Sequence, residues 1–315
     1  MNIDNTKRGT YVRCHRQYYL DHIKGYTSQY GSTALRYGST WHGMKEGYYA
    51  AIAEEGWNKT TVITAAIAKG KEVWEEESIG KQFNDDYRTL ENCMLSFAMF
   101  VEHFAGDEGL LEVIEPEVPF KLKFILSPEE QMAFIYLADM ELFFTGKIDL
   151  EIKLNGRYWV TEDKTTGQSL GLQSERLGRS AQLIGYYTAG GVIFPEPPEG
   201  VLLTMHQLNA YKSKVTGNYG NPKIDFKRVP QIFSEADKEG WRLHFLATAD
   251  DIVKSIETNV WDKNWDACYT FGRCPYYNLC AQNVPLGEEN LEGFITREPW
   301  DVLKGRKEPK KGELR

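Results

Sequence analysis

The sequence has no apolar run near the roughly 18 residues that a membrane-spanning helix requires. It also lacks a basic N-terminal segment followed by an apolar stretch and a small-residue cleavage site, the pattern of a secretory signal peptide. No internal repeat is visible. These absences predict a soluble protein of the cytoplasm that has no membrane partner.

Excess positive charge is missing too, because the formal net charge is -8 over 315 residues. The molecule as a whole is therefore no general binder of polyanions, and a nucleic-acid role would need a local basic surface. Cysteine is scarce, with five residues, an odd number, and three of them fall between Cys268 and Cys280. In a cytosolic protein this pattern favours a metal or cluster site over disulfides.

Hydrophobic residues make up 42% of the chain, enough for one large domain or for a core with an inserted helical part. Residues 1–110 have helical periodicity, with a helix expected to begin near Trp41 after the capping residues Gly-Ser-Thr. Cys93 lies on the apolar face of a further helix and is expected in the core. From Leu111 the pattern alternates with period two, as in half-buried strands. The order of elements predicts an α/β fold with an N-terminal helical elaboration.

Asn155-Gly156 is a signal for a tight type I′ turn, and it predicts an antiparallel hairpin over Gly146–Lys164. Asp149 and Glu162 stand at matching distances from this turn, so their carboxylates are expected to be neighbours. Paired carboxylates repel one another unless a proton or a cation intervenes, which favours Mg²⁺ or Mn²⁺. The alternative is that Asp149, Glu162 and Lys164 only form salt bridges at the end of a strand.

The sequence Gly146-Lys-Ile-Asp149, followed after the hairpin by Glu162-Asp-Lys164-Thr, resembles the PD-(D/E)XK nuclease superfamily. More narrowly, the chain resembles the RecB/AddB-like exonucleases, including CRISPR-associated and phage-encoded members. The resemblance covers most of the chain, from Cys14 to Cys280. One departure is the Glu before x-Lys, where this branch more often has Asp. The resemblance implies a restriction-endonuclease-like core, a mixed central sheet flanked by helices.

The resemblance also implies roles for particular residues. His42, on a helix after Gly38, would be a metal ligand with Asp149, Glu162 and the backbone carbonyl of Asp163, and Lys164 would align the attacking water. Gln182 and Tyr186, one helical turn apart, would complete the catalytic set, with Glu117 as an accessory acid.

The cysteines Cys268, Cys274 and Cys280 have five residues between neighbours, whereas paired zinc ligands usually have two to four. By resemblance, Cys14 would join them as the fourth ligand of a structural [4Fe–4S] cluster. Structural zinc and simple buried thiols are the alternatives. The expected organisation is a helical part (1–110) with Cys14 and the His42 motif, a nuclease core (111–260), a cysteine-rich segment (261–285) and a partly disordered C-terminal tail (286–315).

The sequence therefore predicts a metal-dependent DNA exonuclease or end-processing nuclease in recombination, repair or replication, in the cytoplasm of a bacterium or of a phage-infected host. Its partner would be single-stranded DNA or a DNA end. No G-x-x-x-x-G-K-[ST] motif occurs, so a helicase or recombinase partner would be a separate chain. A catalytically silent DNA-binding or recombination-partner module and an iron–sulfur redox or sensor protein are the alternatives.

Overall fold

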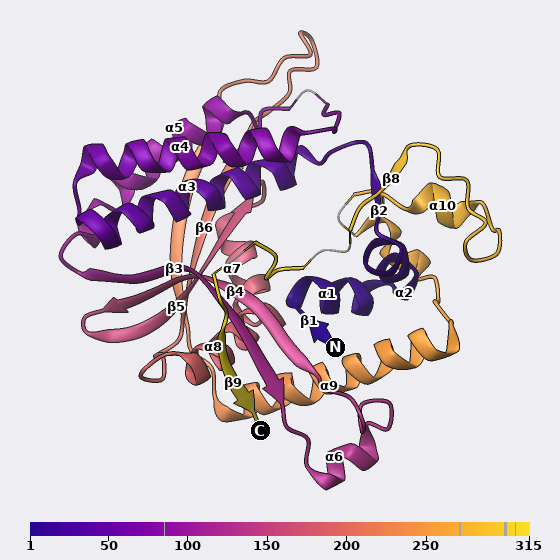
Figure 1. Ribbon diagram of the computed structural model, residues 1–315. Coiled ribbons are helices and arrows are strands. Elements are labelled where there is room, and N and C mark those ends of the chain that lie inside the picture. Colours follow the sequence, from indigo (N-terminus) through magenta and orange to yellow (C-terminus); the bar gives the residue numbers. More distant parts are fainter. Residues whose placement is uncertain (85, 271, 299–300, 306) are drawn as a thin grey trace. The chain divides into compact units, whose positions relative to one another are not determined.

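The computed structural model describes residues 1–84, 86–270, 272–298, 301–305 and 307–315 and contains a mixed β-sheet with helices packed against it (Figure 1). The strands are β1 (Asn2–Ile3), β2 (Tyr26–Ser28), β3 (Leu111–Phe124), β4 (Phe143–Leu154), β5 (Arg157–Thr166), β6 (Val201–Asn209), β7 (Lys223–Gln231), β8 (Phe294–Thr296) and β9 (Lys310–Leu314). The helices are α1 (Asn5–Arg13), α2 (His15–Tyr18), α3 (Thr33–Glu55), α4 (Lys59–Ser78), α5 (Leu90–His103), α6 (Pro128–Ala133), α7 (Leu170–Gly178), α8 (Ala181–Ile193), α9 (Glu235–Thr258) and α10 (Tyr277–Ala281).

The strand order of the sheet is β7-β6-β5-β4-β3-β9, with β1 beside β4. Strands β5 and β6 are parallel, whereas β4 pairs with β5, and β6 with β7, in antiparallel fashion. The predicted α/β class with a mixed central sheet is therefore confirmed. No helix in the described ranges has the length and apolar character needed to cross a membrane.

The chain divides into two compact units. The first comprises Met1–Tyr30, Pro119–Gly146 and Ala236–Arg315, and the second comprises Gly31–Val118 and Lys147–Glu235. Strands β3 and β4 each contribute residues to both units, so this grouping differs from the four consecutive segments expected from the sequence. Residues 310–314 of the expected tail form β9, which runs parallel to the end of β3.

The hairpin predicted from Asn155-Gly156 is present in the second unit as β4 and β5. Asn155 and Gly156 have φ angles of 52° and 78°, the left-handed conformation that a type I′ turn requires at both positions. The register pairs Leu150 with Thr161, and the two strands close on Leu154 and Arg157.

Helix α3 begins at Thr33, eight residues before Trp41. The helix start predicted near Trp41 is therefore wrong. Its N-cap is Ser32, whose side chain accepts a hydrogen bond from the backbone N–H of Leu35 at 3.3 Å. Gly38 is therefore inside the helix and not in its cap. A methyl group there would lie 3.4 Å from Thr165 Oγ1, an ordinary van der Waals contact, so α3 runs close to β5 at this point.

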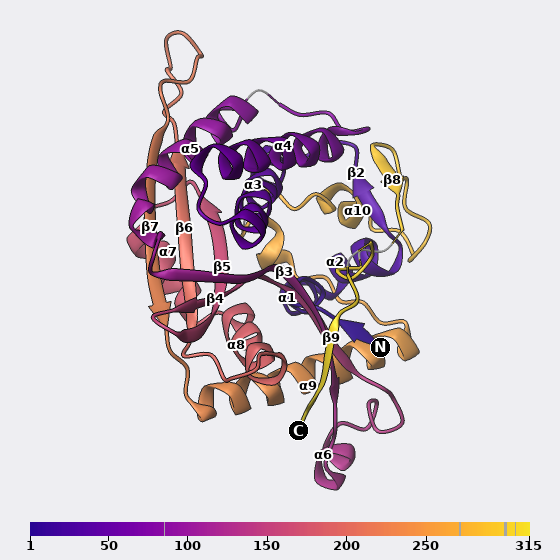
Figure 2. The same cartoon turned by 60° about the vertical axis from the view of Figure 1, so that its left-hand side comes forward.

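The core of the second unit lies between α3, α4 and α5 and one face of β4–β7. Aromatic rings dominate this core. The ring centroid of Trp41 is 5.8 Å from that of Phe97 and 5.6 Å from that of Phe100. Cys93 is fully buried in this cluster, as predicted. Helix α8 covers the opposite face, because a methyl group at Gly190 would lie only 2.7 Å from Val160 Cγ2. Figures 1 and 2 show the three helices together on one side of the strands.

Candidate functional site

The acidic residues of the hairpin lie side by side in the second unit. Continuing the register from Leu150 and Thr161 by one residue places Asp149 opposite Glu162. The backbone N–H of Asp163 donates a 2.8 Å hydrogen bond to Asp149 Oδ2, which fixes the Asp149 carboxylate against β5. Side chains alternate along a strand, so Glu162 and Lys164 share the face of Val160, over which α8 packs.

The Glu162 carboxyl group is almost completely buried, with a side-chain exposure of 2%. Burial, and after it the charge of Asp149, raise the pKa of Glu162 to about 8, while Lys164 acts in the opposite direction. Its Oε2 atom has no hydrogen-bond partner among the described residues. A buried carboxylate oxygen without a partner, next to a second carboxylate, is an arrangement that a divalent cation would stabilise.

Lys164 lies at the solvent side of this pair. Its ammonium group forms an ion pair with Glu162 and keeps 30% side-chain exposure, so it is accessible where Glu162 is not. Burial lowers the pKa of Lys164, but the carboxylates of Glu162 and Asp149 outweigh this effect and raise it above its ordinary value. Lys164 therefore remains a cation, suited to interaction with a phosphate.

His42 approaches the Asp149 carboxylate from α3. Its Nδ1 atom is 3.5 Å from Asp149 Oδ2, and its side chain is 31% exposed. His42 thus adds a nitrogen donor beside the Asp149 carboxylate, although in the described ranges no three His, Cys, Asp or Glu side chains are grouped closely enough to form a ready-made metal site. Magnesium commonly binds through one or two carboxylates and keeps several waters, so this donor set fits such an ion.

Lys45 is a residue that the sequence interpretation missed. It lies one helical turn after His42 on α3, and its Nζ atom is 3.2 Å from Asp163 Oδ1 with both side chains buried. Its ammonium also lies 3.7 Å from the centroid of the Phe100 ring. Asp163 therefore points to the face opposite Glu162, and its backbone N–H is held where it bonds Asp149. The three-residue spacing from His42 was the available signal.

A histidine next to this ion pair was also not singled out. His206 on β6 is 1% exposed, and its ring centroid is 4.1 Å from that of Trp41. Burial, and after it the charge of Lys45, lower the pKa of His206 to about 3, so the ring stays neutral. His206 is therefore part of the aromatic packing behind the site.

The other residues predicted for the nuclease site, Gln182, Tyr186 and Glu117, also lie in the second unit. Gln182 and Tyr186 are one turn apart on α8, the helix that covers the face carrying Glu162 and Lys164. Glu117 on β3 forms an ion pair with Lys147, two residues before Asp149. Its φ angle of 55° is unusual for a residue other than glycine, and such backbone strain is concentrated at functional sites. These roles remain predictions.

The four cysteines come together in the first unit. Cys14, Cys268, Cys274 and Cys280 line one cavity of about 20 Å³, next to Lys263 and Asn264. This volume holds one water-sized particle. Burial raises the pKa of Cys280 to about 11, with a smaller contribution from the neighbouring thiols of Cys14 and Cys274. The cavity is lined by the soft donors that thiophilic metals select, although it has no room for a cluster as it stands.

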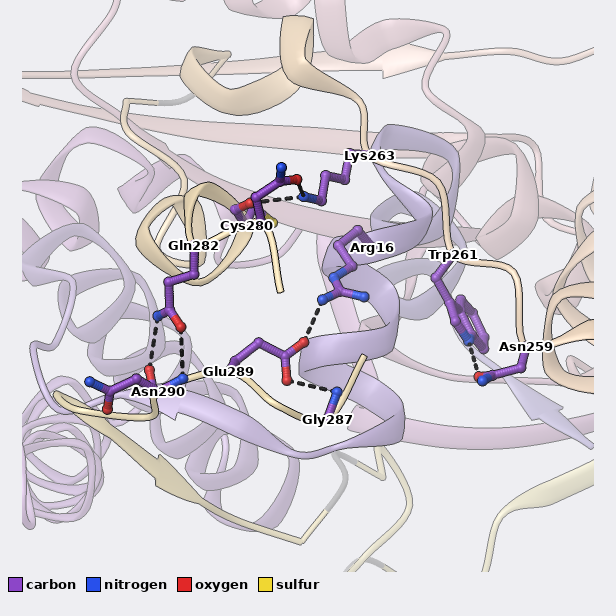
Figure 3. Close-up of polar contacts among 10 residues, drawn as sticks. Arg16, Asn259, Trp261, Lys263, Cys280, Gln282, Gly287, Glu289 and Asn290 are labelled. Atoms are coloured by element: carbon purple, nitrogen blue, oxygen red, sulfur yellow. Dashed lines mark hydrogen bonds and ion pairs between the residues drawn. The ribbon is translucent and has the colours of Figure 1, made fainter. Parts of the chain in front are cut away.

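Other contacts tie the N-terminal helices to residues 263–289 of the same unit and hold that stretch together. Arg16 forms a buried ion pair with Glu289, and Glu289 also accepts a 2.9 Å hydrogen bond from the backbone N–H of Gly287 (Figure 3). Lys263 Nζ donates to the Cys280 carbonyl at 2.8 Å, also drawn in Figure 3. Asn264 donates through its side chain to the Arg13 carbonyl at 2.9 Å. Contacts within this chain therefore join α1 and α2 to residues 263–289.

Comparisons with known proteins address the family. A family model described as the PD-(D/E)XK nuclease superfamily matches residues 6–281. No curated protein matches the chain. A "Putative exonuclease" from Eubacterium rectale has 12% identity and a TM-score of 0.44, covering 96% of this chain and 91% of its own. The crystal structure of SSO0001 has 11% identity and a TM-score of 0.31, covering 78% of this chain and 86% of its own. Likenesses this weak carry no argument.

Proposed function

The chain belongs to the PD-(D/E)XK nuclease superfamily, and on this premise we propose that it is a metal-dependent DNA exonuclease or end-processing nuclease. The observation that carries the proposal is the buried carboxylate of Glu162, which lies beside Asp149. Its Oε2 atom lacks a hydrogen-bond partner among the described residues. Keeping two carboxylates together at this depth is costly, and a catalytic cation explains why both are present.

Asp149, Glu162 and His42, with the backbone carbonyl of Asp163, would hold Mg²⁺ or Mn²⁺. When bound, such an ion stabilises charge on the phosphoryl oxygens and helps to deprotonate water. Lys164 aligns the attacking water and offsets charge on the phosphate. Gln182 and Tyr186 orient the phosphodiester from α8. Water adds to phosphorus, one P–O ester bond breaks, and the departing oxygen takes up a proton.

Within the superfamily we assign the chain to the RecB/AddB-like exonuclease branch. The order of His42, Asp149, Glu162-x-Lys164 and Gln182-x-x-x-Tyr186 supports this assignment. Contacts to phosphate and sugar dominate in such a site, so little base specificity is expected. Action in recombination, repair or phage replication, with any helicase as a separate chain, belongs to the same proposal.

Replacement of Asp149 by asparagine tests the proposed activity. End-labelled single- and double-stranded DNA should be cleaved in Mg²⁺ or Mn²⁺, and chelation by EDTA should stop the reaction. Asp149→Asn should lower the rate by at least about 100-fold, because a ligand charge that acts on the transition state is lost. The matched control Asp139→Asn changes an exposed acid and should retain the wild-type rate. Equal cleavage by all three proteins, or by none, contradicts the proposal.

We further propose that Cys14, Cys268, Cys274 and Cys280 hold a thiolate-bound metal centre, with a structural [4Fe–4S] cluster as the first candidate and zinc as the second. Their convergence on one cavity supports this. The size of the cavity requires the cysteine-rich segment to open around a cluster, whereas a single ion fits more readily.

Anaerobic purification distinguishes these centres. A cluster should give a brown protein that absorbs near ~400 nm, and Cys274→Ser should lose both the colour and the iron. Cys93→Ser, a change at the buried core cysteine, should keep both. A colourless protein with stoichiometric zinc would favour the second candidate, and a protein without iron or zinc would refute both.

A further inference from the structure

The connection between β6 and β7, residues 210–222, has no role in the proposed active site. It is a hydrogen-bonded hairpin, in which Lys212 forms a bridge with Tyr219 and the Ser213 N–H donates to the Asn218 carbonyl at 2.9 Å. Gly217, with a φ of 72°, makes the turn at its tip. Figures 1 and 2 both show it projecting beyond the ends of β6 and β7.

The charge of this hairpin is opposite to that of the whole chain. Between residues 201 and 224 the sequence has no Asp or Glu and contains Lys212, Lys214 and Lys223, whereas the chain has a net charge of -8. All three lysines are exposed, and the Tyr211 ring is 73% exposed beside them. We name residues 210–223 the basic hairpin. It supplies the local positive surface that an acidic protein needs to bind a polyanion.

The basic hairpin begins at the edge of the sheet where the catalytic strand ends. Strands β5 and β6 are parallel, with Lys164 paired to Met205 and Thr166 to Gln207. Both strands therefore leave the sheet in the same direction. From Met205 to Tyr211 the chain advances about 20 Å, at 3.3 Å per residue. A stacked nucleic-acid strand covers this distance with about six nucleotides, at 3.4 Å each.

Two side chains connect the end of β5 to the basic hairpin. A methyl group at Gly167 would lie 3.4 Å from Tyr87 Oη and 3.3 Å from Arg88 Nη2, so both side chains lie directly against the chain that leaves the site. The Tyr87 ring packs edge-on against Tyr219, with 5.3 Å between their centroids. Lys212 Nζ lies over the Tyr219 ring, 4.8 Å from its centroid. Tyr87, Tyr219 and Lys212 thus link the end of the catalytic strand to the hairpin, while Arg88 at the same point is ion-paired with Asp86 at 2.9 Å.

We propose that the basic hairpin, with Tyr87 and Arg88, binds the single nucleic-acid strand that enters or leaves the active site. This inference rests on the proposed nuclease function and adds the path of its substrate. Lys212 and Lys214 neutralise phosphates, and Tyr211 stacks on an unpaired base. An unpaired strand fits better than a duplex, because an exposed ring at a hairpin can stack only on bases that are not paired.

The test compares Lys212→Glu/Lys214→Glu with the control Lys59→Glu/Lys71→Glu, which makes the same charge change at exposed positions of α4. Binding of a fluorescent 20-nucleotide strand is measured by anisotropy in EDTA over a range of salt concentrations. The hairpin variant should bind at least 10-fold more weakly than wild type at ~50 mM salt. Its salt slope should fall by about 1.4, at about 0.7 for each phosphate that the two lysines no longer neutralise. The control should match wild type.

Cleavage separates this inference from the function on which it rests. The loss in kcat/KM of the hairpin variant should grow with substrate length, from a four-nucleotide strand, too short to reach the hairpin, to a 20-nucleotide strand. Wild-type-like binding by the hairpin variant, or equal weakening in both variants, overturns the inference, whether or not DNA is cleaved. If wild type binds the strand but cleaves neither it nor bis(p-nitrophenyl) phosphate in Mn²⁺, the nuclease proposal fails and the binding surface stands.

Discussion

Glu162→Gln is expected to lower the rate of DNA cleavage by about a thousand-fold and to remove stabilisation of the protein by metal, without unfolding it. A thousand-fold loss corresponds to about 4 kcal/mol of activation free energy. The variant keeps the size of the side chain and removes only the charge. In the absence of metal its melting temperature at pH 7 should stay close to that of wild type, because a pKa of about 8 already keeps most of the wild-type Glu162 side chain protonated.

Differential scanning fluorimetry with and without Mn²⁺ measures the predicted loss of stabilisation by metal. An ion at about 100 times its Kd stabilises a folded protein by about 2.7 kcal/mol, so wild type should gain several degrees in Tm. Glu162→Gln should gain almost nothing, and Glu54→Gln, at an exposed position on α3, should respond like wild type. A full metal response in Glu162→Gln would show that this carboxylate is not a ligand.

The hairpin could be predicted from the sequence because its determinants are local. Asn155-Gly156 specifies the turn, and alternation assigns Glu162 and Asp163 to opposite faces. The start of α3 was wrong because Gly38 was treated as a helix cap. The same tripeptide, Gly-Ser-Thr, also occurs at residues 31–33, and its Ser32 is the N-cap of α3, so two equivalent local signals competed and the later one was chosen.

Contacts between residues distant in sequence explain what was missed in the site. Lys45 has the spacing to face the sheet beside His42, but its partner Asp163 can be identified only once α3 is placed against β5. The basic hairpin was overlooked for a different reason. Its three lysines are diluted in a chain with net charge -8, and their significance comes from the parallel pairing of β5 and β6.

Lys45→Met is expected to cost about 3–5 kcal/mol of stability, because it leaves the Asp163 carboxylate buried without its cation. Methionine keeps the length and apolar character of the lysine stem, so packing against Phe100 is largely preserved. The double variant Lys45→Met/Asp163→Asn should recover most of the loss, since no uncompensated charge remains. Urea denaturation measures both values. Lys69→Met breaks an exposed pair with Glu72 on α4 and should cost less than about 1 kcal/mol.

The same variant tests whether the buried pair supports the site. Asp163 donates its backbone N–H to Asp149 Oδ2, so movement of Asp163 should displace a proposed metal ligand. Under conditions where Lys45→Met is folded, the Mn²⁺ concentration for half-maximal cleavage should rise by about 10- to 100-fold, the usual effect of losing a group that orients a ligand. The double variant should restore stability more fully than metal affinity, because asparagine no longer has an ion pair to hold the strand. Unchanged stability in Lys45→Met would contradict this prediction and show that the pair with Asp163 contributes no net stability.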